Sequence, residues 1–134
     1  MLLKTTKFKN NIKPLFILLC ILFICTSGLT AQVKYKTRKY RRYIIKTPYL
    51  NGQIHGVKIT KYRTGMIYSK ISYKYNKLHG PEIFYYRNGR IRTKRNWIDN
   101  KLTGKSYYYY KNGRISRIST YRDNALNGSY IQYY

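Results

Sequence analysis

The sequence predicts an all-β protein: an elongated single-layer antiparallel meander of 24-residue β-hairpin repeats, preceded by a helical signal peptide. Two series of glycines, each with a spacing of 24 residues, predict the repeat. Asn-Gly pairs between aromatic and apolar runs predict the hairpins, because a type I′ turn needs positive φ at both central residues. No apolar period of 3.6 residues survives between the glycines, which disfavours helix.

The first 31 residues form a separate segment. Several lysines precede an apolar stretch at 14–25, and small residues follow it up to Ala31. We therefore expect a signal peptide that is cleaved after Ala31, and a secreted or cell-envelope location. A membrane anchor formed by residues 15–33 is the alternative, because the basic run at 34–43 would oppose export.

The next segment, residues 32–42, is polar and basic and has no clear period. We predict a flexible basic linker there. Both cysteines, Cys20 and Cys25, precede this segment, so the mature chain would have no disulfide and no cysteine metal site.

The repeat domain is expected to cover residues 43–134. Its units are 50–73, 74–97 and 98–121, followed by a half unit at 122–134, and 43–49 fits a leading half repeat. The residues that define the repeat are Gly56, Gly65, Gly80, Gly89, Gly104, Gly113, Gly128, Tyr62, Tyr86, Tyr110 and Tyr134.

The turns and strands follow from this register. Asn88-Gly89 and Asn112-Gly113 predict type I′ turns, whereas Thr64-Gly65 is a poorer signal and suggests another turn type. The second connection of each unit, such as 98–104, reads as a longer loop, with Asp99 as a turn former, like Asp123 one repeat later. Strands are predicted near 43–49, 57–62, 67–73, 81–86, 91–97, 105–110, 115–121 and 129–134.

Two stretches, "YNKLHGPEIFYYRNGRI" at 75–91 and "DNKLTGKSYYYYKNGRI" at 99–115, resemble the bacterial variant of the MORN repeat. The resemblance covers residues 50–134 and departs from the pattern at Lys61 and Thr64, so the first hairpin is the least secure. It implies successive hairpins in a twisted single-layer sheet and scaffolding or surface-binding roles, often at membranes. Some bacterial members of the family carry an antitoxin-like annotation.

A single-layer sheet cannot enclose a core between two layers, so aromatic side chains must supply much of the buried area. Strand alternation places Ile59, Ile83 and Tyr107 on one face and Phe84 and Tyr108 on the other. The aromatic rows are therefore either the structural ladders of the sheet or, interleaved with Arg and Lys, platforms that stack on sugars or bases.

Charge gives the strongest indication of a partner. Lys and Arg number 28 against 3 acidic residues, for a net charge of +25. Such a charge indicates an anionic partner, or alternatively no more than a solvated surface for a tyrosine-rich sheet. The candidate contacts to an anionic surface are Arg87, Arg90, Arg92, Lys94, Arg95, Lys111, Arg114 and Arg117.

Catalytic chemistry finds little support in the residues, so we expect no enzyme and no cofactor. Glu82 and the two turn aspartates do not form the converging carboxylates that a hydrolase needs. His55 and His79 share one repeat column, but the column continues as Thr103 and Asn127, so no third metal ligand follows.

Three function classes remain. The first is an exported, non-catalytic structural or interaction module at an anionic cell-envelope surface of membrane headgroups or glycans. The second is a protein-binding, antitoxin-like module, and the third is a nucleic-acid-binding protein, which export disfavours. Strand 129–134 carries no charge or proline that would discourage pairing at an open edge, so a homodimer or another protein could add a strand there.

Overall fold

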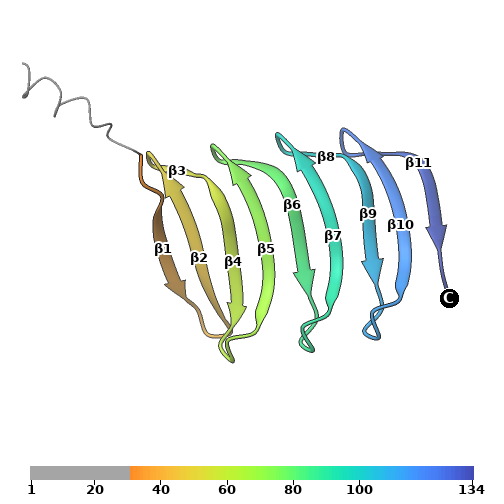
Figure 1. The fold of residues 1–134 in the computed structure, drawn as a ribbon, viewed down its shortest axis with the longest axis horizontal. Helices are drawn as coiled ribbons and strands as arrows, with labels where there is room; N and C mark the ends of the chain where they lie inside the picture. The colour runs from red at the N-terminus through yellow and green to blue at the C-terminus, as the bar shows by residue number, and fades with distance from the viewer. Residues whose placement is uncertain (1–30) are drawn as a thin grey trace, which may run out of the picture. The chain divides into compact units, whose positions relative to one another are not determined.

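The computed structural model describes residues 31–134, and the predicted signal helix lies outside the described residues. Within them, eleven strands form one antiparallel sheet in which the long strands follow each other in chain order, as Figure 1 shows. The prediction of an all-β single-layer meander is confirmed. The strands are β1 (Lys34–Lys39), β2 (Tyr43–Leu50), β3 (Gln53–Ile54), β4 (Gly56–Tyr62), β5 (Ile67–Lys74), β6 (Lys77–Tyr85), β7 (Ile91–Ile98), β8 (Lys101–Leu102), β9 (Gly104–Tyr109), β10 (Ile115–Arg122) and β11 (Ala125–Gln132).

The predicted linker at 32–42 is largely a strand. Residues 34–39 form β1, which pairs antiparallel with β2 and places Lys36 opposite Thr47. The prediction of a flexible linker is therefore wrong for these residues. Its alternating tyrosine and threonine suit a strand, the Lys46 ammonium lies 4.1 Å from the ring centre of Tyr35, and exposed charge is common at a sheet edge.

The glycine turns differ from the predicted type I′. The N–H of Gly89 donates to the carbonyl of Tyr86 over 3.0 Å, and Gly89 has φ of 81°. Asn88 is not among the described residues with positive φ, so the turn is type I, closed by a glycine bulge. Asn112-Gly113 and Thr64-Gly65 repeat this arrangement, with Gly113 bonded to Tyr110 and Gly65 to Tyr62. The first turn is therefore not type I′, as expected, but it does not differ from the other two, because only the glycine needs positive φ.

At the opposite end of the sheet, the predicted longer loop at 98–104 is a tight turn. Asp99 and Asn100 both have positive φ, 46° and 68°, and β8 pairs back on β7 through Trp97 and Leu102. These values indicate type I′. Tyr75-Asn76 and Asp123-Asn124 have the same conformation, so β6 and β11 begin four residues earlier than predicted, at Lys77 and Ala125. The prediction that Asp99 and Asp123 form turns is confirmed.

The register divides the side chains between two faces. Phe84 pairs with Thr93, Thr93 pairs with Tyr108, and Tyr108 pairs with Arg117, so these four residues lie on one side, which we call the arginine face. The other side, the lysine face, carries a row that runs Lys46, Ile59, Lys70, Ile83, Lys94, Tyr107, Ile118 and Ile131. Aromatic side chains thus line both faces, as predicted.

Burial is concentrated in small side chains. Ser69, Ser106 and Ser119 on the arginine face are among the most buried side chains of the described residues. Their small size lets neighbouring long and aromatic side chains lie over them, which is how a single layer removes area from water.

Candidate functional site

Stacked arginine and aromatic side chains occupy the arginine face. The guanidinium of Arg117 lies 3.8 Å from the ring centre of Tyr108, and that of Arg92 lies 5.4 Å from that of Phe84. Arg87 lies over Tyr62 at 5.3 Å. Each guanidinium lies over a π face, and its outer N–H groups can still donate to an acceptor.

An aromatic cluster supports these arginines. The rings of Tyr43, Tyr62 and Tyr68 lie 5.2 to 5.5 Å apart, and Tyr68 meets Phe84 edge-on at 5.6 Å. Such tilted pairs are the favoured geometry of aromatic rings. The face therefore combines a rigid aromatic base with positive charge above it.

The eight predicted contacts do not form one patch. Four of them, Arg87, Arg92, Arg95 and Arg117, lie over aromatic rings of the arginine face. Lys94 lies on the lysine face instead, because it pairs with Ile83 and Tyr107.

The remaining three contacts, Arg90, Lys111 and Arg114, lie in or beside the glycine turns. Arg90 donates from Nη1 to the carbonyl oxygens of Lys111 and Asn112 in the next hairpin, so its guanidinium joins two repeats. Sequence reasoning grouped all eight because repeat position and charge do not reveal which face a bulged strand presents.

All three acidic residues have partners of their own. Glu82 lies 3.3 Å from Nε of Arg95 and accepts a hydrogen bond from Trp97 at 3.1 Å. Asp99 contacts His79 at 3.4 Å, and Asp123 contacts Lys101 at 3.3 Å. Within the described residues, neither Arg92 nor Arg117 has a carboxylate partner.

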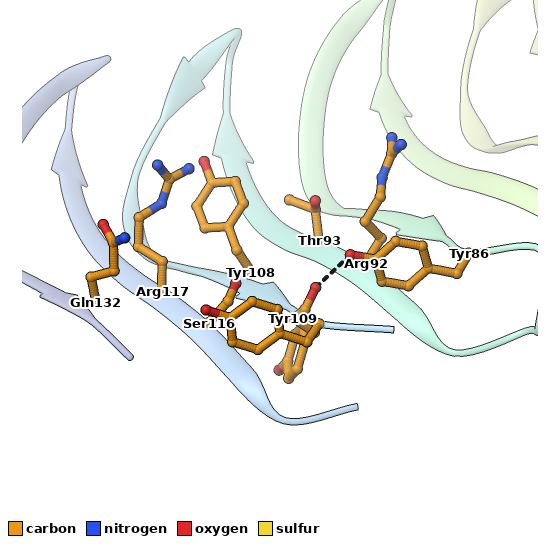
Figure 2. A pocket seen from close by; sticks show the side chains of 9 residues that line it. Tyr86, Arg92, Thr93, Tyr108, Tyr109, Ser116, Arg117 and Gln132 are labelled. Atoms are coloured by element: carbon orange, nitrogen blue, oxygen red, sulfur yellow. Dashed lines mark hydrogen bonds between the residues drawn. The ribbon is translucent and has the colours of Figure 1, made fainter. Parts of the chain in front are cut away.

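A hollow of about 400 Å³ opens between these two arginines, and Figure 2 shows it with Tyr108 standing between them. We call it the Arg92–Arg117 hollow. Its lining residues are Tyr86, Arg92, Thr93, Tyr108, Tyr109, Tyr110, Ser116, Arg117 and Gln132. Sequence reasoning found the two arginines and named Tyr108 in an aromatic row, but it missed Thr93, Ser116 and Gln132, which only the strand register brings beside them.

The repeat-defining residues are structural. Gly65, Gly89 and Gly113 close the turns, and Gly56, Gly80, Gly104 and Gly128 also have positive φ. Tyr86 and Tyr110 donate their hydroxyl protons to the carbonyls of Tyr109 and Tyr133, each over 2.7 Å, and so join one repeat to the next. Tyr134 is fully exposed.

The two histidines face different neighbours. The ring of His55 meets that of Tyr75 at 4.6 Å, whereas His79 faces Asp99. In the part of the chain that the structure describes, no group of three or more His, Cys, Asp or Glu side chains could hold a metal ion. Between residues 31 and 134, no helix has the length and hydropathy of a membrane span.

The family model of the MORN repeat variant matches three consecutive segments, residues 54–75, 78–99 and 102–123. Each segment begins two residues after the positive-φ pair of the preceding tight turn and ends at the first residue of the next such pair. No curated protein matches the chain.

Proposed function

The chain belongs to the MORN repeat variant family, and we propose that it is an exported, non-catalytic repeat module that binds an anionic surface of the cell envelope. The family is generally non-catalytic and commonly mediates binding to membranes or proteins. Among these partners, an anionic surface suits this chain best.

The observation that carries the proposal is the unpaired charge of the arginine face. Glu82 already contacts Arg95, and the two aspartates contact His79 and Lys101, so the chain itself neutralises neither Arg92 nor Arg117. Guanidinium groups held on aromatic rings bind oxyanions with little loss of side-chain freedom. A row of them along one face suits a surface that presents many anionic groups.

Export rests on the sequence of residues 1–31. The expected product of cleavage begins at Gln32, and intact-mass measurement on protein from its native host tests this. A chain that retains Met1 and sediments with membranes would instead support the anchor at residues 15–33.

Surface binding is tested with the chain that begins at Gln32, whose sheet is a compact unit by itself. We expect it to sediment with vesicles that contain anionic lipid and not with neutral vesicles. Raising the salt to about 1 M, where the Debye length falls to ~3 Å, should release it. Equal binding at low and high salt would contradict a charge-driven interaction.

A protein partner is the second candidate, and β11 favours it. All eight residues of this outer strand are exposed, including Leu126 and Ile131. A partner, such as a toxin in an antitoxin-like role, could add a strand to this edge. A pull-down from the native host with β11 intact and with a charge placed on it distinguishes this function from surface binding. Competition by DNA or RNA tests the nucleic-acid alternative.

A further inference from the structure

We propose that the Arg92–Arg117 hollow binds a sugar ring that carries a phosphate or sulfate group. The proposal rests on the proposed function, because it gives the chemistry that the arginine face recognises on an anionic surface. The ligand would bind at one defined site, whereas the proposed function requires only a general attraction between charges.

The oxyanion is indicated by the two guanidinium groups. Arg117 is fixed over Tyr108, and Arg92 over Phe84, so both are positioned before a ligand arrives. Nε of Arg117 is buried and has no hydrogen-bond acceptor within the described residues. An oxyanion would instead bind the outer N–H groups of the guanidinium, which no carboxylate of the described residues contacts.

The sugar ring is indicated by the remaining lining. Tyrosine rings form much of the wall, and the hydroxyls of Tyr86 and Tyr110 hold two of them in place. The polar side chains of Thr93, Ser116 and Gln132 lie at separate points around the same hollow (Figure 2). Dispersed hydroxyl and amide groups match a ring with hydroxyls on several carbons, and aromatic rings pack against its C–H groups. A volume of about 400 Å³ falls within the usual range for small-ligand sites.

The repeat itself argues that the fold does not require this arrangement. One repeat earlier, the position of Arg117 holds Thr93, and one repeat later, the position of Arg92 holds Ser116. The two arginines therefore occupy different repeat columns, and they line the same hollow from β7 and β10, the strands on either side of β9. Because the equivalent positions of the neighbouring repeats hold other residues, the sheet does not need an arginine at either place. Two such arginines that line one hollow therefore indicate a ligand.

The test uses the chain that begins at Gln32 and titration calorimetry with glucose 6-phosphate. We expect it to bind more tightly than glucose or inorganic phosphate alone. The double variant R92Q/R117Q should lose about tenfold or more in affinity, since two charge-assisted contacts disappear. The matched control K70Q/K94Q removes the same charge from the lysine face and should bind like the parent.

Several outcomes would overturn the site. If both double variants lose the same affinity for glucose 6-phosphate, the binding is a general charge attraction. If inorganic phosphate binds as tightly as the sugar phosphate, the hollow contacts an oxyanion but has no sugar site. A clear preference for a nucleotide would show a base-stacking site instead. If R92Q/R117Q fails to fold, as judged by its thermal melt, R117K replaces it: the charge remains but the planar fork is lost, and affinity should still fall.

Vesicles separate the two possible sources of the sugar and separate this proposal from the proposed function. Vesicles with phosphatidylinositol 4-phosphate, whose phosphorylated inositol ring carries hydroxyls as a sugar does, should bind the parent better than phosphatidylserine vesicles of equal charge if the ring belongs to a lipid headgroup. Equal binding to both, with glucose 6-phosphate still bound in the hollow, would indicate a soluble or polymeric glycan. If the parent binds anionic vesicles but not glucose 6-phosphate, the site is contradicted and the proposed function is not. If the parent binds glucose 6-phosphate but not the vesicles, only the proposed function is contradicted.

Discussion

Asn100 is bonded twice to Leu78 in the preceding repeat. Its backbone N–H donates to the carbonyl of Leu78 over 2.9 Å, and its side-chain Oδ1 accepts from the N–H of Leu78 over 2.7 Å. Asn76 bonds Ile54 in the same way, and Asn124 bonds Leu102. These asparagines extend the sheet's hydrogen bonding across the tight turns and fix the spacing of the repeats.

Replacing Asn100 by glycine should therefore destabilise the sheet. Glycine tolerates the φ of 68°, so the variant mainly removes the bond from Oδ1 to Leu78. We expect the free energy of unfolding to fall by about 1 kcal/mol in a urea titration. The control Asn100→Asp keeps an acceptor oxygen and should lose less. Equal losses for both would show that Oδ1 is not the stabilising group.

Much of the architecture was accessible from the sequence, because glycine spacing and strand composition report on backbone geometry directly. The turn types were not. The side-chain Oδ1 of Asn88 accepts a hydrogen bond from the backbone N–H of Arg90, which favours a type I turn with a glycine bulge. The type I′ turns instead use pairs such as Asp99-Asn100, and the asparagines at 76, 100 and 124 were the available signal. The Arg92–Arg117 hollow could not be predicted, because bulges shift which strand residues share a face.

Tyr75 holds a strained backbone position, with φ of 48°, where the equivalent residues of later repeats are Asp99 and Asp123. A tyrosine in this region costs about 1 kcal/mol relative to an asparagine. We expect Tyr75→Asn to raise the free energy of unfolding by about that amount, measured by urea titration. Tyr75→Ala keeps the strain and loses the contact with His55, so it should give no gain. A gain of similar size from alanine would show that the tyrosine side chain, and not its φ, is unfavourable.

Gly80 and Gly104 differ in the space that a side chain would meet. A Cβ at Gly80 would lie 3.3 Å from Cβ of Ser72, whereas a Cβ at Gly104 would meet nothing within 4 Å. Both have positive φ, 96° and 79°, so alanine should cost about 1 kcal/mol or more at either position. Gly80→Ala should be the more destabilising of the two in thermal melts. The reverse order would show that the backbone strain at each glycine outweighs contact with Ser72.

The sheet should lose stability in alkali through Tyr73. Burial, and then the negative charge of Glu82, raise the pKa of Tyr73 above its ordinary value of 10.0. As pH rises, the unfolded chain loses this proton first, so the stabilisation is complete below pH 10.0 and declines as pH rises through the folded-state pKa. Tyr73→Phe has no proton to lose. Its free energy of unfolding should fall less than that of the parent between about pH 9 and pH 11. If the free energy of unfolding of both proteins falls equally with pH, Tyr73 is not the cause of the loss.

The outer strand β11 should mediate self-association. Its eight residues are uncharged and exposed, whereas β1 at the other edge carries Lys34, Lys36, Arg38 and Lys39. Two copies of β11 can therefore pair antiparallel without placing like charges opposite each other, and β1 cannot.

Ile131→Lys tests this pairing, because it places a charge on each copy of a strand that otherwise carries none. Light scattering after size exclusion should show a dimer for the parent and a monomer for the variant. Val57→Lys is the matched control, because Val57 is 43% exposed against 42% for Ile131 and lies on the same lysine face, but in the interior strand β4. The control should remain dimeric. A parent chain that is monomeric at high concentration would leave this edge to a different protein, as in the second candidate function.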